Sequence, residues 1–193
     1  MHHKYHTEAL IFGSSDYKES AKIFFVFTRD LGLLYASAQG IRKMSSKLRY
    51  VLQDFSYTKI DLVKGKDFWR ITSASKTSEL EEVGKQVDSL RVFAHISKLL
   101  RRLLPEQEKN EALFTEVING LFALEKAKTR EDINNIEIII VLRVLSNLGY
   151  IGDIDSLANL IKSPLEEELI FEMSKNKSQA IIEINKALRE TQL

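Results

Sequence analysis

Residues 22–38 of the chain read KIFFVFTRDLGLLYASA. The run Ile23–Phe27 is too rich in aromatic and β-branched residues to be typical of a helix. The triplet Asp30-Leu31-Gly32 suits a short hairpin connection, and a second apolar run follows it at residues 33–38. This stretch therefore predicts a pair of strands near the beginning of the chain.

Similar segments lie on both sides of this hairpin. Residues 5–12 end in the apolar run ALIF and predict an opening strand, and the turn-rich residues GSSDYKES follow at positions 13–20. Residues 57–63 alternate in part between apolar and polar side chains. A turn at residues 64–67 then leads into a last strand at residues 68–72. Five short strands within about 75 residues favour a small barrel such as the OB-fold.

After Thr77 the apolar residues recur with a helical period. We expect a first helix with Val83, Val87, Leu90 and Ala94 along one apolar stripe, ending near Pro105. The stripe is widened by Phe93, Ile96, Leu100 and Leu104. Arg101 and Arg102 lie near its end, where cations stabilise the helix dipole; the alternative is that they capture an acidic peptide or a phosphate.

Later helices are predicted from their capping residues. Asn110 is a favoured first residue for a second helix, and Thr129 with Asp132 forms an imperfect capping box for a third. The third helix extends to about Gly149 and is apolar nearly all round, which is typical of a buried central helix. Shorter helices are expected at residues 154–161, 165–171 and 178–188.

The predicted fold class is α+β and multidomain. An OB-fold-like barrel occupies residues 1–77 and an all-α domain occupies residues 78–193, with the boundary near residues 76–82. Residues 1–76 carry a net charge of +6 and residues 77–193 a net charge of −5. The first part is therefore expected to face a polyanion, although ordinary solvated surface explains the charges equally well.

Several functional classes receive no support from the sequence. The chain has no cysteine, which excludes disulfides and thiolate metal sites and fits a reducing cytoplasm. Its longest apolar run, residues 138–142, is too short to span a bilayer, and the first ten residues lack the apolar core of a signal peptide. No Walker A motif or catalytic constellation is present. We expect neither an enzyme nor a cofactor or metal.

The most informative stretch for function is residues 39–50, QGIRKMSSKLRY. It places four cations, Arg42, Lys43, Lys47 and Arg49, among glycine and serine residues. Lysine and arginine neutralise phosphates, small residues let the backbone approach, and aromatic rings stack on bases. We predict nucleic-acid contact here; the alternative is a solvated loop. The candidate stacking residues, each of which could instead belong to the core, are Tyr35, Tyr50, Phe55, Tyr57 and Trp69.

Several segments, in their order along the chain, resemble the bacterial RecO family. In the barrel part these are TEALIFG at 7–13, SDYKES at 15–20, FTRDLG at 27–32, GIRK at 40–43, SKLR at 46–49 and LQDFS at 52–56. In the helical part they are LLPE at 103–106, NEALF at 110–114, LRVL at 142–145 and LGY at 148–150. Many members carry a four-cysteine zinc motif after this last segment, and here it is missing, so the resemblance ends near residue 155.

The resemblance implies a non-enzymatic mediator of DNA repair and homologous recombination in the bacterial cytoplasm, at the nucleoid. Such proteins bind single-stranded and double-stranded DNA and anneal complementary strands. They act with RecR, and often with RecF, to help RecA replace the single-strand-binding protein. In this chain the DNA contacts would be Arg42, Lys43, Lys47 and Arg49, with Lys22 and Arg70 as further candidates.

The family also binds the acidic C-terminal tail of the single-strand-binding protein through its helical domain. The candidates for that contact here are Arg101, Arg102 and Arg143. Two other functions stay open at this point. One is an OB-fold RNA-binding factor that uses the same basic loop, and the other is a non-catalytic protein-interaction scaffold.

Overall fold

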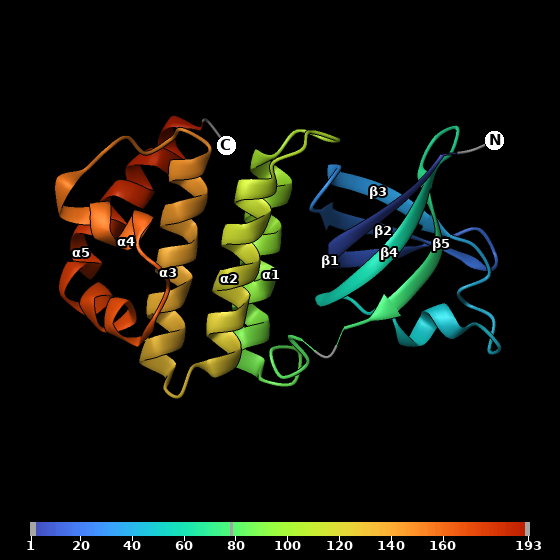
Figure 1. Ribbon diagram of the computed structural model, residues 1–193, viewed down its shortest axis with the longest axis horizontal. Coiled ribbons are helices and arrows are strands. Elements are labelled where there is room, and N and C mark those ends of the chain that lie inside the picture. The colour runs from blue at the N-terminus through green and yellow to red at the C-terminus, as the bar shows by residue number, and fades with distance from the viewer. Residues whose placement is uncertain (1–2, 78, 192–193) are drawn as a thin grey trace.

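The structure is a computed structural model that describes residues 3–77 and 79–191 (Figure 1). Within these residues the chain forms five strands followed by five α-helices. The strands are β1 (Lys4–Tyr17), β2 (Ala21–Thr28), β3 (Gly32–Ala38), β4 (Ser56–Lys64) and β5 (Trp69–Lys76). The helices are α1 (Val87–Leu103), α2 (Glu111–Lys126), α3 (Arg130–Asn147), α4 (Ala158–Lys162) and α5 (Glu167–Glu190). Short 3-10 turns lie at η1 (Lys47–Tyr50) and η2 (Asp155–Leu157). The α+β layout predicted from the sequence is confirmed.

The strands close into a barrel in the order β1-β2-β3-β5-β4. Neighbouring strands are antiparallel except β3 and β5, which pair in parallel over two residues, and β1 closes the barrel against β4. Apolar side chains from all five strands, including Ile11, Val26, Leu34, Ile60 and Ile71, fill the interior. The predicted OB-fold-like barrel is therefore present.

The prediction of a turn at residues 13–20 is wrong for its first half. β1 continues to Tyr17, and the turn to β2 takes up only residues 18–20. The pairing register shifts between Ile11 and Gly13, and Gly13 has a φ of 149°, a conformation that glycine adopts readily. This bulge lets one strand bend and pair with both β2 and β4. The polar residues that follow face solvent, which explains why their composition resembles a turn.

The first helix begins later than its periodicity suggested. Val83 is buried, but it lies in the turns that precede α1, and Val87 is 83% exposed at the start of the helix. The predicted apolar residues Phe93, Ile96 and Leu100 are buried along α1, together with Val92. Val83 continues the helical spacing of the apolar residues although it lies in a turn. The periodicity therefore predicts a helix start that is too early.

The caps and the central helix agree with the predictions. The side-chain oxygen of Asn110 accepts a hydrogen bond from the Leu113 N–H at 2.9 Å, and Thr129 and Asp132 form a reciprocal capping box. α3 lies between α2 and α5 (Figure 1). Within the described residues, no helix combines the length and the apolar character required to cross a membrane.

The last two predicted helices, at residues 165–171 and 178–188, are one continuous helix, α5. The polar residues 174–177 include neither proline nor glycine, so nothing in them interrupts a helix. Leu169, Met173, Ala180, Ile184 and Ala187 form one buried stripe along its whole length. Packing of this stripe against α3 accounts for the continuity.

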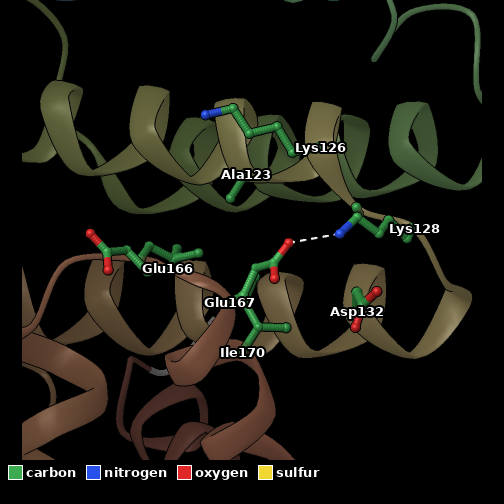
Figure 2. Close-up of a pocket in the computed structure, with 9 residues that line it drawn as sticks. Ala123, Lys126, Lys128, Asp132, Glu166, Glu167 and Ile170 are labelled. Atoms are coloured by element: carbon green, nitrogen blue, oxygen red, sulfur yellow. Dashed lines mark hydrogen bonds and ion pairs between the residues drawn. The ribbon is translucent and has the colours of Figure 1, made fainter.

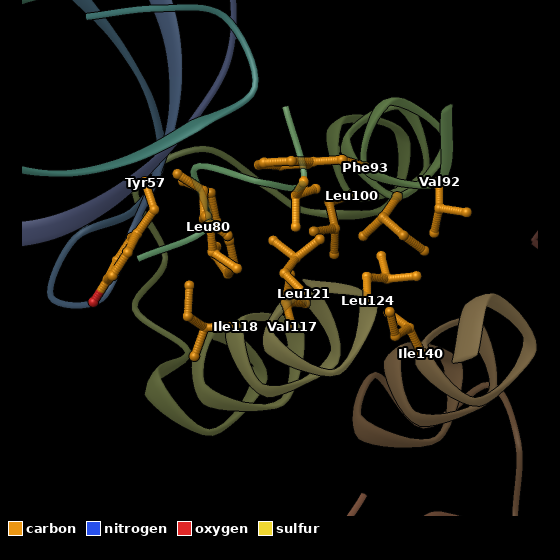
Figure 3. Packing of buried hydrophobic residues seen from close by; sticks show 14 of the residues in the cluster. Tyr57, Leu80, Val92, Phe93, Leu100, Val117, Ile118, Leu121, Leu124 and Ile140 are labelled. Carbon is orange, nitrogen blue, oxygen red and sulfur yellow. The ribbon is translucent and has the colours of Figure 1, made fainter. Parts of the chain in front are cut away.

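The barrel and the helices share a single hydrophobic cluster (Figure 3). The Phe27 ring of β2 lies between Phe12 of β1 and Phe114 of α2, with ring centres 6.0 and 5.4 Å apart. Phe93 of α1 meets Phe12 edge-on at 6.4 Å. The expected division at residues 77 and 78 remains our proposal, and residue 78 lies outside the described residues. Because the barrel and the helices both contribute side chains to this cluster, separating the two parts would expose apolar side chains of each.

The link between α1 and α2 also runs along the barrel. The Gln107 N–H donates to the Leu33 carbonyl at 2.8 Å, and the Gln107 side chain accepts from the Trp69 indole N–H at 3.1 Å. Gly32 has a φ of 70°, and a Cβ there would lie 2.0 Å from the Glu108 carbonyl oxygen. Position 32 therefore requires glycine for both its backbone conformation and this close approach.

Arg143 of α3 is placed inside the fold. Its side chain is 6% exposed, its Nη1 is 3.0 Å from a Glu116 carboxylate oxygen, and its Nε–H donates to the Leu160 carbonyl at 2.9 Å. Nη2 donates to the Ser163 carbonyl. The prediction that Arg143 contacts an acidic tail is therefore corrected, because its donors are used to join α3 to α2, to α4 and to the α4–α5 connection.

We expect Phe27→Ala to lower the free energy of unfolding by about 3–5 kcal/mol, because the ring fills space between barrel and helices. Urea unfolding followed by the fluorescence of Trp69, the chain's single tryptophan, and by helical circular dichroism should give coincident transitions. Val87→Ala, at an exposed position, should change the free energy of unfolding by less than about 0.5 kcal/mol. Equal effects of the two substitutions would show that the shared core is unimportant.

We also expect Arg143→Ala to lower the free energy of unfolding by about 3 kcal/mol, because it leaves the polar partners of a buried cation unsatisfied. Arg102→Ala, on exposed surface, should be within about 0.5 kcal/mol of the parent. The same urea titration measures both. A neutral Arg143→Ala would reopen the possibility that this residue serves a partner.

Candidate nucleic-acid interface

The basic stretch forms part of the loop between β3 and β4, residues 39–55. Two of its apolar residues, Ile41 and Leu52, are buried in the hydrophobic cluster of the barrel. They anchor both ends of the loop to the barrel, and η1 lies between them. Figure 1 shows this loop and η1 on the side of the barrel away from the helices. Its cations therefore project from an anchored segment.

Arg42 connects this loop to the turn between β1 and β2. Its backbone N–H donates to the Ser20 carbonyl at 3.2 Å, and its Nη1 donates to the Lys18 carbonyl at 3.3 Å. Its Nη2 lies 3.4 Å from a carboxylate oxygen of Asp16. Because both of these side chains are largely exposed, this ion pair contributes little and does not prevent Arg42 from meeting an anion.

An open cleft of about 470 Å³ lies between the loop and the neighbouring strands. Three of the six predicted DNA contacts, Lys22, Arg42 and Arg49, line it. Ser14 of β1 and Lys22 of β2 form one wall of the cleft, and the Lys22 ammonium donates to the Ser14 hydroxyl at 3.3 Å. The fold thus brings together cations that are up to 27 positions apart in the sequence. Among the described residues, Asp54 is the one acidic side chain that lines this cleft.

The other predicted cations are placed differently. Lys43 and Lys47 are exposed on the same loop but do not line the cleft. Arg70 is exposed on β5, where it pairs with Ser37 of β3. β3 separates it from the β2 strand that carries Lys22. Lys43 and Lys47 therefore extend the charged surface of the loop, whereas Arg70 lies on the adjoining barrel wall.

Most of the candidate stacking residues belong to the core. Tyr57 and Trp69 are buried, Phe55 packs on Phe93, and Tyr35 packs on Phe25. Burial is the main cause that raises the pKa of Tyr57, so its hydroxyl stays neutral. Tyr50 differs, because it is 67% exposed at the end of η1, and the Arg49 guanidinium carbon lies 5.4 Å from its ring centre. Among these five, Tyr50 is the ring that an unpaired base could reach.

Three further cations, which no motif in the sequence singles out, lie at the same end of the barrel. The Tyr17 and Phe68 rings meet edge-on at 5.7 Å, which places the turn between β4 and β5 beside the end of β1. Lys64 and Lys66 are exposed around that turn, and Lys18 lies 5.1 Å from the centre of the Tyr17 ring. OB-folds bind oligonucleotides with these two connecting loops. The predicted OB-fold is therefore a signal that could have identified these lysines, because they lie in its binding loops. They do not form a cluster in the sequence.

Of the arginines predicted to bind a partner, Arg101 and Arg102 lie in the last turn of α1. The Arg101 guanidinium carbon is 3.9 Å from the centre of the Phe25 ring, so this side chain joins α1 to β2. Arg102 is exposed. Arg101 is exposed as well, so both arginines stay accessible, although Arg101 also packs on Phe25.

A second cleft of about 470 Å³ lies in the helical part, between the end of α2 and the beginning of α5 (Figure 2). Lys126 and Lys128 line it together with three carboxylates, Asp132, Glu166 and Glu167. Lys128 is already 2.8 Å from a carboxylate oxygen of Glu167. Anionic side chains outnumber the lysines here, so the cleft beside the basic loop is the better site for a polyanion.

Comparison with known proteins agrees with this architecture. The family model for the N terminal of Recombination protein O matches residues 1–79, and the model for its C terminal matches residues 86–174. The chain is 28% identical over 152 residues to the DNA repair protein RecO of Caldanaerobacter subterraneus subsp. tengcongensis, covering 79% of this chain and 61% of that protein. For RecO of Desulfitobacterium hafniense the identity is 27% over 146 residues, covering 76% and 52%.

A further relative, RecO of Thermodesulfovibrio yellowstonii, is 28% identical over 170 residues, covering 86% of this chain and 66% of the relative. The matches to these three relatives thus span from about half to two thirds of their length. The two family models are adjacent, follow the order of barrel and helices, and together cover most of the sequence. The chain therefore belongs to the RecO family.

Proposed function

We propose that this protein acts in DNA repair and homologous recombination as a mediator that binds DNA, at the nucleoid in the bacterial cytoplasm. The observation that carries the proposal is the cleft lined by Lys22, Arg42 and Arg49, with Lys43 and Lys47 exposed on the same anchored loop. Such a surface attracts phosphates of either single-stranded or double-stranded DNA. Membership of the RecO family supports the choice of DNA repair.

The interface explains how binding alone could promote annealing. Phosphate contacts neutralise the charge that keeps two complementary strands apart, and they carry no base information. Strands of any sequence would therefore be held with their bases available for pairing. We propose that the protein anneals complementary strands in this way, without a covalent step or a cofactor.

The proposed partners follow from the same role. We propose that the protein acts with RecR, and with RecF where it is present, to help RecA replace the single-strand-binding protein. Its exposed Arg101 and Arg102 are candidate contacts for the acidic tail of that protein, because accessible cations at a helix end can meet a carboxylate. Arg143 is not a candidate, because it is buried.

The competing functions predict different binding behaviour. An RNA-binding factor would prefer RNA in a competition between DNA and RNA oligonucleotides of identical sequence, because the 2′-hydroxyl distinguishes them. A protein-interaction scaffold would bind neither. We expect DNA to compete at least as well as RNA, because phosphate contacts at the cationic cleft do not need the 2′-hydroxyl.

The salt dependence of binding tests the interface quantitatively. The slope in question is that of the logarithm of the binding constant against the logarithm of the salt concentration. If each of the four loop cations neutralises about one phosphate of a single strand, together they contribute about −2.8 to this slope, roughly −0.7 each. The four are Arg42, Lys43, Lys47 and Arg49. Each single substitution by alanine should therefore flatten the slope by roughly 0.7, and by the same amount on unrelated sequences. Fluorescence anisotropy of a labelled oligonucleotide at several salt concentrations measures these slopes.

A charge-matched variant provides the control. Replacing all four loop cations with alanine should nearly abolish binding, while circular dichroism stays native. The same change in net charge can be made in the helical part, at Arg130 of α3, Lys162 of α4, and Lys177 and Arg189 of α5. This variant should keep most of the affinity, because these helices lie on the other side of the molecule from the basic loop (Figure 1). Normal affinity in the loop variant would place the DNA-binding surface elsewhere.

A further inference from the structure

The outer face of α5 carries large apolar side chains that the fold leaves exposed. Phe171 is 67% and Ile182 58% exposed, and both belong to the longest helix in the described part of the chain. The opposite face of α5 packs against α3 through Leu169, Met173 and Ala180. The helix is therefore held firmly in place while its outer face has no cover within the described residues. Exposed apolar patches of this kind commonly mark interaction surfaces.

We define the outer face of α5 by six exposed residues spaced three or four apart: Glu167, Phe171, Lys175, Ser178, Ile182 and Lys186. Residues with this spacing lie on one side of an α-helix. Along this face an acidic residue lies near the N-terminal end, apolar residues lie on either side of the middle, and a basic residue lies near the C-terminal end. Lys175 covers part of the Phe171 ring, with its Nζ 5.2 Å from the ring centre.

This order makes the face complementary to itself. If two copies of α5 lie antiparallel about the midpoint between Asn176 and Lys177, residues equally far from that midpoint face one another. Phe171 then faces Ile182 of the other copy, and Glu167 faces Lys186. Both contacts occur twice, as a two-fold symmetric interface requires. A partner surface of uniformly positive or uniformly negative charge would match only one end of the face, whereas a second copy matches both ends.

We propose that the outer face of α5 is a self-association surface through which two copies of this chain form an antiparallel, two-fold symmetric dimer. The inference goes beyond the proposed function and does not depend on it. The family model for the C terminal ends at residue 174, so Ser178, Ile182 and Lys186 lie outside the matched region.

The position of α5 has a consequence for DNA binding. α5 and the basic loop lie at opposite ends of the molecule (Figure 1). A dimer joined through α5 would therefore carry its two basic clefts at its two outer ends. Each cleft could hold a separate DNA segment, and neither would be covered by the interface.

Sedimentation velocity of the full chain, from micromolar to millimolar concentrations, tests the proposal. We expect a concentration-dependent shift from one copy to two. Phe171→Ser and Ile182→Ser should each weaken dimerisation by at least about tenfold, because each substitution removes two central contacts from a symmetric interface. Val87→Ser, at the most exposed apolar position of α1, should have no effect. A single species of one copy throughout, or unchanged association of the two α5 variants, would overturn the proposal.

Charge reversal tests the antiparallel register. Glu167→Lys and Lys186→Glu should each weaken dimerisation, because each puts like charges opposite one another. The loss of the Glu167 ion pair with Lys128 matters little, because both side chains are more than 70% exposed. An equimolar mixture of the two variants should restore dimers, since each reversed residue then faces an opposite charge. Failure of the mixture to restore dimers that the parent protein forms would overturn this arrangement.

Discussion

Four phenylalanine rings, from β1, β2, α1 and α2, hold the barrel against the helices. Phe12, Phe27, Phe93 and Phe114 belong to one buried cluster, so neither part of the chain can separate without exposing aromatic surface to water. The loop between α1 and α2 adds a backbone hydrogen bond to β3 and requires glycine at position 32. These contacts occupy one side of the barrel and leave the opposite end, with its connecting loops, open to solvent.

This placement explains why the cations gather where they do. A connecting loop tolerates exposed lysines and arginines, whereas the packed side of the barrel does not. Ile41 and Leu52 anchor the basic loop, and Arg42 ties it to the turn between β1 and β2. The positive charge therefore has a defined position relative to the strands, as binding to a polyanion requires. The helical part, which is net negative, lies on the other side.

Local chemistry made much of the fold predictable, and tertiary packing accounts for the rest. The hairpin at residues 22–38 and the caps at Asn110 and Thr129 depend on neighbouring residues, so a sequence reveals them. The length of β1 depends on a bulge, and the continuity of α5 depends on packing against α3. At the site, the basic loop was recognisable as a cluster of charge. The lysines of the other two turns, and the burial of Arg143, required knowledge of which distant segments meet.

We propose that DNA binds at the end of the barrel formed by the basic loop and the two neighbouring turns. The most direct test is a titration of the ¹⁵N-labelled protein with a single-stranded oligonucleotide, followed by NMR amide chemical shifts. We expect the shifts to concentrate in residues 18–22, 39–55 and 64–70, while α4 and α5 stay nearly unchanged. Shifts confined to the helical part, with the basic loop unaffected, would contradict it.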